Sequence, residues 1–431
     1  MTNKHRALLT LLPFLLTSAP LRAQDVDPAR SQLAQEKLQQ YLQADPEKRP
    51  PLEKESFATT PLSRDSAAAI EKLLWEDHVK QIKLSRADEI KDKKIVEGKL
   101  EMPFFYTTFG EKPKTGRSLF ISMHGGGGAP KALNDSQWEN QKHLYKLTEG
   151  VYLAPRAPTN NWNLWHESHI DRMFDRLIED LIVFEDVDPN HVYIMGYSAG
   201  GDGVYQLAPR MADRFAAASM MAGHPNDSQP LGLRNLPFAI HVGALDAAYN
   251  RNKVAAEWGK KLDDLQKSDP DGYIHVAKLH EGKPHWMDRE DAEAIPWMAQ
   301  YTRNPFPKKV AWKQASTTHD RFYWLAVPKD DAKAGDEITA TIQGQQITLE
   351  TKDAPHVIIR LNDKMLDLDK PITVQFGTQK LFEGTLPRTT AAIAKTLTER
   401  GDPTAIFTAE LDIKTPVQPK APPAKVDAQV H

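Results

Sequence analysis

Residues 191–203, HVYIMGYSAGGDG, constrain the fold of this chain more than any other stretch. The apolar run at 192–195 is typical of a buried strand, and a helix is expected at 204–211. The turn between them is GYSAG at 196–200. A serine on so tight a turn needs small residues two positions before it and two after it. The turn holds the hydroxyl above the sheet edge, beside the free N–H groups and positive dipole end of the helix. Ser198 is therefore the candidate nucleophile, and an exposed serine in a glycine-rich turn is the simpler alternative.

Strands and helices alternate between residues 95 and 305. Such alternation predicts an α/β domain with a mostly parallel sheet and helices on both faces, because parallel connections cross over through helices. The expected strands lie at 97–109, 117–123, 151–155, 192–195, 215–221, 238–242 and 273–279, and the expected helices at 170–183, 204–211, 247–265 and 291–302.

The first 23 residues have the pattern of a cleavable export signal. A basic start at 4–6 precedes an apolar stretch at 7–16 that is too short to span a bilayer, and cleavage is expected near Ala23. We therefore expect a signal peptide at 1–23 and export to the periplasm or secretion. Residues 24–94 carry apolar residues at helical spacing and predict a helical segment before the α/β domain.

After residue 307 the alternation stops, and short strands separated by turn residues follow. Residues 308–412 are expected to form a small antiparallel β-rich accessory domain with one helix near 389–400. Its aromatic residues belong either to a core or to a carbohydrate-binding surface; they are Trp312, Phe322, Tyr323 and Trp324. Residues 413–431 are rich in proline and alanine and predict a disordered tail.

Composition argues against several classes of protein. The chain has 431 residues, a formal net charge of −3 with both signs well mixed, and no cysteine. The mixed charge argues against a nucleic-acid partner, and no stretch after the leader is apolar enough to span a bilayer. The lack of cysteine removes disulfides, thiol nucleophiles and cysteine-based zinc sites. No metal-ligand cluster is visible in the sequence, and we expect neither a metal nor an organic cofactor.

A nucleophilic serine requires a base, an orienting acid and donors for an oxyanion. The sequence HGGGG at 124–128 directly follows an expected strand. Its glycines let backbone N–H groups turn toward a substrate oxygen without the steric penalty of a Cβ atom. We expect the oxyanion donors to be the N–H of Ala199 and that of Gly125 or Gly126. His124 is expected to be structural.

Asp246 is the preferred acid. It follows the expected strand 238–242 in a loop opened by Gly243. A carboxylate at this place can reach a histidine on the next loop along the sheet edge. Asp227, in the loop before, is the alternative, and Asp202 is expected to be too close to the serine turn.

His285 is the preferred base among the chain's 15 histidines. It stands in the loop after the last expected strand, 273–279, so that the candidates follow the order serine, aspartate, histidine. His280, at the end of that strand, is the alternative. His241 and His275 lie inside expected strands and are interpreted as structural.

These motifs together resemble the esterase branch of the α/β-hydrolases, with the nearest likeness to secreted feruloyl esterases and polyhydroxybutyrate-depolymerase-like proteins. The resemblance implies an α/β-hydrolase fold over residues 95–305 and ester hydrolysis by a Ser-His-Asp triad without a cofactor. The chain departs from the pattern of these proteins in two ways: it has no cysteine, and the Lys283-Pro284 pair precedes His285. The resemblance is therefore not used to identify the substrate. The segments that carry the likeness are HGGGG at 124–128, VDPNHVYIMGYSAGG at 187–201, GALD at 243–246 and HEGKPHW at 280–286.

The loop at 157–167 lies between the glycine-rich motif and the serine turn. Its Trp162 and Trp165 are candidates for an aromatic wall around a sugar or phenolic ring, and packing of the loop onto the body is the alternative. Tyr197, next to the nucleophile, is a third candidate for substrate contact.

The sequence thus predicts a serine hydrolase acting on a small-molecule or polymer-linked ester, of the feruloyl, acetyl or short-chain hydroxyacyl type. A prolyl-oligopeptidase-like peptidase is one alternative, and it is disfavoured because the segment before residue 95 is too short for a propeller. A non-catalytic polysaccharide-binding protein on the same fold is the other, and the complete set of candidate residues argues against it.

Overall fold

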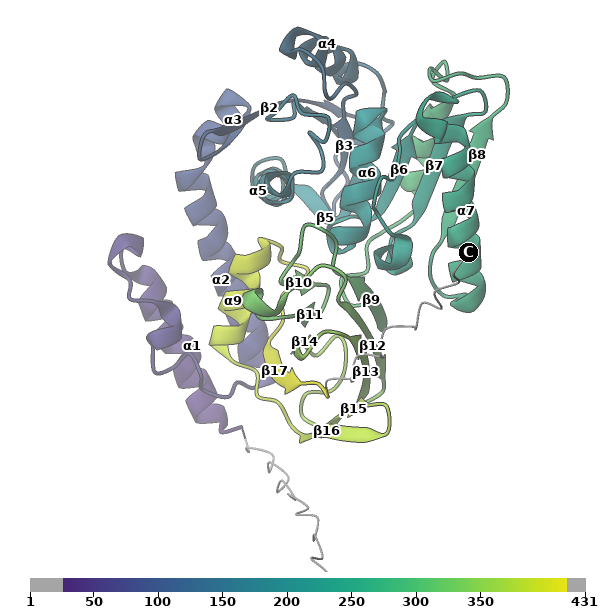
Figure 1. Cartoon of the computed structure of the whole chain (residues 1–431). Helices are drawn as coiled ribbons and strands as arrows, with labels where there is room; N and C mark the ends of the chain where they lie inside the picture. The colour runs from purple at the N-terminus through teal and green to yellow at the C-terminus, as the bar shows by residue number, and fades with distance from the viewer. Residues whose placement is uncertain (1–25, 417–431) are drawn as a thin grey trace, which may run out of the picture.

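The computed structural model describes residues 26–416 and shows an α/β body, a smaller β-rich part and a pair of long helices along one side (Figure 1). The predicted signal peptide and nearly all of the predicted tail lie outside the described residues. Among residues 26–416, no helix is both long enough and apolar enough to cross a membrane.

The body is built on an eight-stranded sheet with the order β1-β2-β4-β3-β5-β6-β7-β8. The strands from β4 through β8 in this order run parallel, while β1 and β2 form an antiparallel edge. The chain leaves β3 for one neighbour, β4, and then returns to β5 on the other side, so the strand order switches at β3. The bounds are β1 (Lys94–Glu97), β2 (Leu100–Phe109), β3 (Arg117–Met123), β4 (Gly150–Pro155), β5 (Val187–Tyr197), β6 (Ala217–Met221), β7 (Phe238–Gly243) and β8 (His275–His280).

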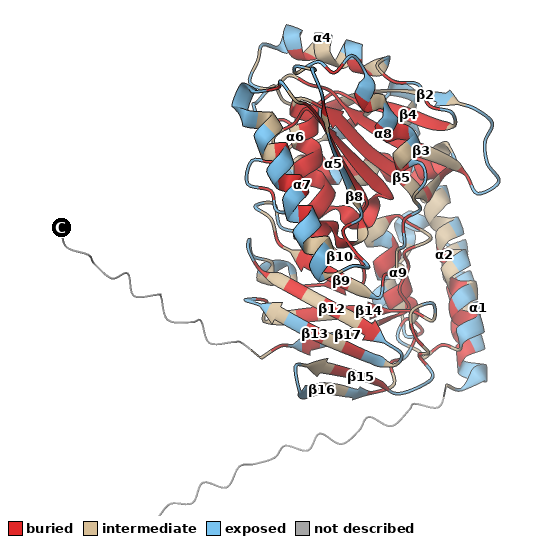
Figure 2. Ribbon diagram, turned by 90° about the vertical axis from the view of Figure 1, so that its right-hand side faces the viewer, coloured by how far each residue is buried: buried red, intermediate tan, exposed pale blue. Residues whose placement is uncertain are grey.

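Helices cover both faces of this sheet, and its central strands are buried (Figure 2). In β3, Leu119 and Ile121 join the core under one set of helices, while Phe120 joins the core on the opposite face. Alternate side chains of one strand therefore enter two different cores, as expected of a sheet covered on both sides. The helices of the body are α4 (Lys131–Lys142), α5 (Ser168–Phe184), α6 (Ala199–Arg210), α7 (Arg251–Ser268) and α8 (Ala294–Met298).

The sequence-based helix at 291–302 was too long. A 3₁₀ turn, η6 (Glu290–Glu293), occupies its first part, and α8 is a short helix that contains Pro296 near its start. A proline is tolerated there because the first N–H groups of a helix have no intrahelical partner.

The N-terminal segment is helical, as predicted. It comprises α1 (Pro28–Gln43), α2 (Arg64–Ser85) and α3 (Ala87–Asp92). Asp27 and Ser63 cap α1 and α2 with their side-chain oxygens. The two long helices form a core with α9 (Thr390–Arg400) of the β-rich part, and Figure 1 shows α9 beside α2.

The β-rich part consists of two sheets, ordered β10-β11-β14-β17 and β16-β15-β13-β12-β9. Its pairing is antiparallel except between β13 and β15, which run parallel, so the expectation of a purely antiparallel domain was wrong. Its four aromatic residues named above are buried, which removes them as a carbohydrate surface. The bounds are β9 (Lys309–Lys313), β10 (Arg321–Phe322), β11 (Leu325–Ala326), β12 (Glu337–Gln343), β13 (Gln346–Lys352), β14 (His356–Leu361), β15 (Ile372–Phe376), β16 (Gln379–Gly384) and β17 (Ala409–Lys414).

A buried ion-pair network joins the two parts. Arg303 Nη2 lies 2.6 Å from Asp402 Oδ2, and its Nη1 donates to the carbonyl of Asp213 at 2.7 Å. The Asp213 carboxylate in turn pairs with Arg400 of α9. The neighbouring arginines hold the pKa of Asp213 and of Asp402 at about 2, although burial alone would raise it. The β-rich part is therefore attached to the α/β body through buried ion pairs, in which each charge is compensated by its partner.

Candidate active site

Ser198 lies at the end of β5 and directly before α6, at the carboxyl edge of the sheet beside β3. Its backbone has φ 58° and ψ −120°, which is rare for a residue with a side chain. A Cβ atom at Gly196 would overlap the carbonyl of Gly200, and one at Gly200 would overlap the carbonyl of Met123. The turn therefore requires glycine at both positions.

The three predicted triad residues lie in hydrogen-bond contact. His285 Nε2 is 3.0 Å from Ser198 Oγ, and His285 Nδ1 is 2.7 Å from Asp246 Oδ2. An ionised carboxylate such as the buried Asp246 can accept hydrogen bonds but cannot donate them. His285 Nδ1 therefore carries the ring proton, and Nε2 presents a lone pair to the Ser198 hydroxyl. Arg251 approaches the other Asp246 oxygen at 3.6 Å. This arrangement can take a proton from the serine and stabilise the imidazolium that results.

The alternative residues are engaged elsewhere. Asp227 accepts a hydrogen bond from the Gln206 side chain, and Asp202 accepts one from the backbone N–H of His224. His280 is buried, with Nε2 3.1 Å from His241 and Nδ1 3.1 Å from Glu290. Both of its ring nitrogens thus have partners other than Ser198. His275, with Nδ1 on the carbonyl of Tyr273, is held structurally.

The glycine loop at 124–128 packs against the serine turn. A Cβ atom at Gly125 would lie 3.2 Å from Ser198 Cβ. Gly126 has φ 107°, a conformation that favours glycine, and the side chain of Asn134 fills the space beside it. Asn134 Oδ1 accepts a hydrogen bond from Gly127 N at 2.8 Å, and its Nδ2 donates to the carbonyl of Ala129 at 3.0 Å. The loop is therefore fixed by a buried asparagine on α4 that the sequence interpretation missed; an asparagine shortly after a glycine run was the available signal.

His124 anchors the start of the same loop. Its Nε2 accepts a hydrogen bond from Ala157 N at 3.2 Å, which leaves Nδ1 to donate to the carbonyl of Gly125 at 2.6 Å. Burial lowers the pKa of His124 to about 4, so the ring is neutral at ordinary pH. These contacts agree with the structural role predicted for His124.

Trp165 does not form a substrate wall. It is fully buried, and its Nε1 donates to the carbonyl of His124 at 2.9 Å. The loop at 157–167 is thus pinned beneath the glycine loop by this side chain. Trp162, by contrast, is 63% exposed.

Two cavities open beside Ser198. The larger, about 860 Å³, is lined by Gly125, Gly126, Leu144, Tyr197 and Trp286 among others. The smaller, about 240 Å³, is more polar and is lined by Gly126, Trp162, Ala199, Asp202, Tyr249 and Arg251 among others. All three residues predicted to supply oxyanion donors therefore line the space around the serine.

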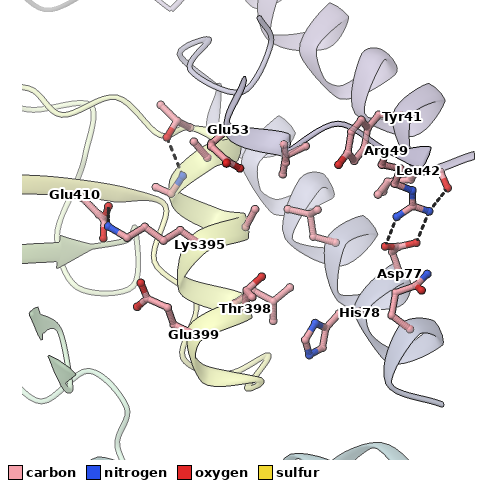
Figure 3. A pocket seen from close by; sticks show the side chains of 18 of the residues that line it. Tyr41, Leu42, Arg49, Glu53, Asp77, His78, Lys395, Thr398, Glu399 and Glu410 are labelled. Atoms are coloured by element: carbon pink, nitrogen blue, oxygen red, sulfur yellow. Dashed lines mark hydrogen bonds and ion pairs between the residues drawn. The ribbon is translucent and has the colours of Figure 1, made fainter. Parts of the chain in front are cut away.

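A third cavity, of about 750 Å³, lies between α9 and the pair α1–α2 (Figure 3). Arg49 and Asp77 form an ion pair at 2.7 Å on one wall, and Lys395 and Glu410 pair on the other. The described residues that line it include none of those around Ser198, and they form no constellation of nucleophile and base.

Comparison with known proteins gives one curated relative and several solved structures. No protein-family model matches the chain. The putative esterase NocK of Nocardia uniformis subsp. tsuyamanensis is 30% identical over 131 residues, which cover 27% of this chain and 37% of that relative. The chain thus matches little more than a third of the relative's length.

Similar solved structures cover about half of this chain. A thermostable esterase has a TM-score of 0.39 at 20% identity over 49% of this chain and 62% of its own. Est1E from Butyrivibrio proteoclasticus has a TM-score of 0.33 at 13% identity, over 48% of this chain and 95% of its own. An acetyl xylan esterase from Aspergillus awamori has a TM-score of 0.34 at 11% identity, over 48% of this chain and 97% of its own.

The fold class follows from the topology of the chain's own structure. A serine stands on a strand-to-helix turn at the carboxyl edge of a mostly parallel sheet, and the aspartate and histidine follow on the loops after β7 and β8. This is the α/β-hydrolase fold. The predicted α/β-hydrolase domain, with a helical N-terminal segment and a smaller C-terminal β domain, is confirmed.

Proposed function

We propose that this chain is a serine hydrolase that cleaves carboxylic esters through an acyl-enzyme. The observation that carries the proposal is the continuous hydrogen-bond chain from Ser198 Oγ through His285 to the buried Asp246. The esterase named among the relatives agrees with this activity.

In the proposed reaction, Ser198 Oγ attacks the ester carbonyl carbon while His285 Nε2 takes the hydroxyl proton. Asp246 keeps His285 in the tautomer this step needs and stabilises its charged form. The tetrahedral oxyanion accepts hydrogen bonds from the backbone N–H of Ala199 and of Gly125 or Gly126. His285 then gives its proton to the departing alcohol, and water, activated by the same histidine, releases the acid.

The substrate proposed is a small-molecule or polymer-linked ester of the feruloyl, acetyl or short-chain hydroxyacyl type. The two cavities support an ester with one large and one small side, because their volumes are about 860 and 240 Å³. Apolar Leu144 and Trp286 line the larger one, which suits an aromatic or aliphatic group, and the smaller is bordered by charged groups. Export through residues 1–23 is part of the same proposal, and it rests on the basic start and short apolar stretch of that segment.

The test is hydrolysis of a panel by the full chain and by Ser198→Ala. The panel comprises p-nitrophenyl acetate, p-nitrophenyl butyrate, methyl ferulate, an acetylated xylan fragment and a proline-containing peptide amide. The proposal predicts ester turnover that falls by several orders of magnitude in Ser198→Ala. Turnover of the amide in preference to the esters would identify a peptidase, and turnover of none would leave a binding protein.

A further inference from the structure

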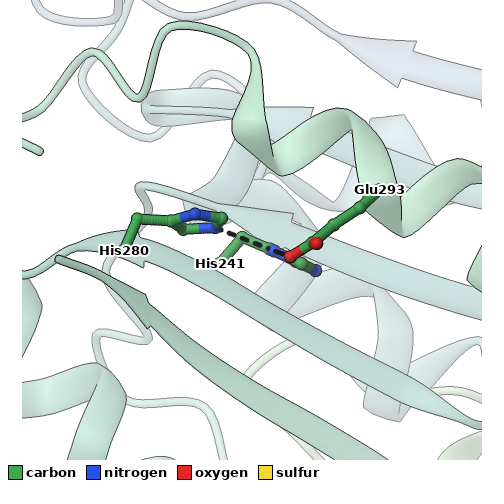
Figure 4. A group of neighbouring side chains, drawn as sticks. All are labelled: His241, His280 and Glu293. Carbon is green, nitrogen blue, oxygen red and sulfur yellow. Dashed lines mark hydrogen bonds and ion pairs between the residues drawn. The ribbon is translucent and has the colours of Figure 1, made fainter.

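We propose that His241, His280 and Glu293 form a binding site for a divalent transition-metal ion, with Zn²⁺ as the best-fitting one (Figure 4). The histidines come from β7 and from the end of β8, and the carboxylate comes from η6. Figure 4 shows the three side chains converging from these elements. His241 Nδ1 lies 3.1 Å from His280 Nε2 and 3.6 Å from Glu293 Oε1.

The spacing fits a tetrahedral ion. With metal–ligand bonds of about 2.05 Å, the corners of a tetrahedron lie about 3.3 Å apart. The separations of 3.1 and 3.6 Å bracket that value, and all three ligand atoms lie within 4.8 Å of one another. Two imidazoles and one carboxylate are a donor set that suits zinc and its neighbours rather than Mg²⁺ or Ca²⁺, which prefer oxygen ligands. Glu293 is exposed, so an ion can enter from solvent and keep water at its fourth corner.

A second carboxylate orients one of the ligands. Glu290 Oε2 lies 3.1 Å from His280 Nδ1, so this nitrogen donates its proton and Nε2 directs a lone pair at His241. A carboxylate behind a ligating histidine is the usual support of a metal site. On the other side, His241 Nε2 has no hydrogen-bond partner among residues 26–416. Without a metal, His241 Nδ1 donates its proton to His280 Nε2, and no described partner of His241 Nε2 opposes a shift of the ring proton to that nitrogen when an ion binds Nδ1.

Lys278 competes with the ion. Its Nζ lies 2.5 Å from Glu293 Oε1 and 2.7 Å from Oε2, which holds the carboxylate when no metal is bound. A metal ion would have to share this carboxylate with the ammonium group and would be repelled by its charge. Removal of the Lys278 charge should therefore raise the affinity for the metal, and this effect distinguishes a metal site from a chance group of side chains.

The proposed ion would be structural. The loop after β7 carries Asp246, the loop after β8 carries His285, and η6 follows that second loop. One ion on His241, His280 and Glu293 would fasten all three segments together. None of these three ligands lines the cavities beside Ser198 in the described structure, so the ion would not touch the reacting atoms. Metal binding at these residues can therefore be tested independently of the esterase activity.

The experiment is calorimetric titration of tag-free, chelator-treated full chain with Zn²⁺, together with its thermal unfolding with and without the metal. We expect one ion per chain and a higher melting temperature in its presence. Co²⁺ in the site should give the visible absorption of a tetrahedral complex. Glu293→Gln and His280→Gln should weaken Zn²⁺ binding at least about tenfold, Glu290→Gln by about ten- to a hundredfold, and Lys278→Met should strengthen it several-fold.

The matched control is His356→Gln, which removes another histidine that lies between two carboxylates, those of Asp331 and Asp412. It should leave the affinity unchanged. The exposed Glu293 keeps the test valid if His280→Gln fails to fold. Absence of Zn²⁺ binding, or binding equally tight in Glu293→Gln, would overturn the proposal.

Discussion

The Tyr197 hydroxyl donates a hydrogen bond to the backbone carbonyl of His285 at 2.5 Å. The same hydroxyl accepts one from Met287 N at 3.2 Å. Tyr197 directly precedes the nucleophile, so one side chain ties the serine turn to the loop that carries the histidine. Burial raises the pKa of Tyr197, which keeps the donor proton in place at any ordinary pH. The sequence predicts substrate contact for Tyr197; the residue lines the larger cavity, but its hydroxyl bonds to the loop that carries His285.

Tyr197→Phe should therefore lower kcat by about fivefold with little change in KM. A net hydrogen bond contributes about 1 kcal/mol, and about 1.4 kcal/mol corresponds to a factor of ten in rate. The measurement is steady-state kinetics on the best ester of the panel. Tyr193→Phe is the control, because Tyr193 lies on the same strand and its hydroxyl also bonds to a backbone carbonyl, that of Tyr301. Equal kcat losses in both variants would contradict the positioning role.

Asn134→Ala should disturb the glycine loop. The substitution leaves Gly127 N without its acceptor, which costs about 1–3 kcal/mol where the group is buried. Because small misplacements of catalytic groups reduce rates by up to about a hundredfold, kcat should fall by ten- to a hundredfold. The control Asn362→Ala removes a buried asparagine whose Nδ2 bonds to Ile406 O in the β-rich part. Asn362→Ala should lower the melting temperature and leave kcat unchanged. An unchanged kcat in Asn134→Ala would contradict the proposed role of Asn134 in holding the glycine loop.

The site could be predicted in large part because its residues follow strand ends. Parallel strands bring their carboxyl ends to one sheet edge, so the loop at 124–128, Ser198, Asp246 and His285 had to gather there. Side-chain direction could not be predicted in the same way. Trp165 packs against Gly203, where a Cβ atom would lie 2.5 Å from the Trp165 Cβ, and no local pattern marks that contact. Its burial follows from tertiary packing alone.

Non-local pairings account for the other differences. The parallel pairing of β13 with β15 depends on the course of the chain between them and has no sequence period of its own. The group of His241, His280 and Glu293 likewise comes from three separate elements, so sequence spacing offers no motif for it.

Substitutions of the two tryptophans in the loop at 157–167 should have different effects, one on substrate binding and the other on stability. Trp162→Ala should raise KM several-fold at unchanged stability, since the side chain is exposed and borders the smaller cavity. Trp165→Ala should instead lower the free energy of unfolding by about 3–5 kcal/mol, as removal of a large buried aromatic does. Kinetics and denaturant unfolding of both variants provide the check. A stability loss in Trp162→Ala as large as that in Trp165→Ala would contradict the assignment.

Asp402→Asn should loosen the attachment of the β-rich part. Breaking one partner of a buried ion pair costs about 3–5 kcal/mol because the remaining charge is left unpaired, here that of Arg303. Asp264→Asn is the control: it removes an exposed partner of Lys260 and should change stability by less than about 1 kcal/mol.

The same pair predicts an acid dependence. The folded-state pKa of Asp402 is about 2, below its usual value near 3.8, so the pair stabilises fully above about pH 4. This stability should be lost as the pH falls through 2. The free energy of unfolding should therefore decline less between pH 4 and pH 2 in Asp402→Asn than in the parent chain. Equal slopes over that window would show that the pair does not titrate as proposed.

The most direct test of the central claim, that Ser198 is an activated nucleophile, is covalent labelling with a fluorophosphonate, located by mass spectrometry. We predict stoichiometric labelling at Ser198, none in Ser198→Ala, and strongly slowed labelling in His285→Ala, with exposed Ser316→Ala labelled like the parent. Labelling that persists in Ser198→Ala, or a folded parent chain that does not label, would contradict the account.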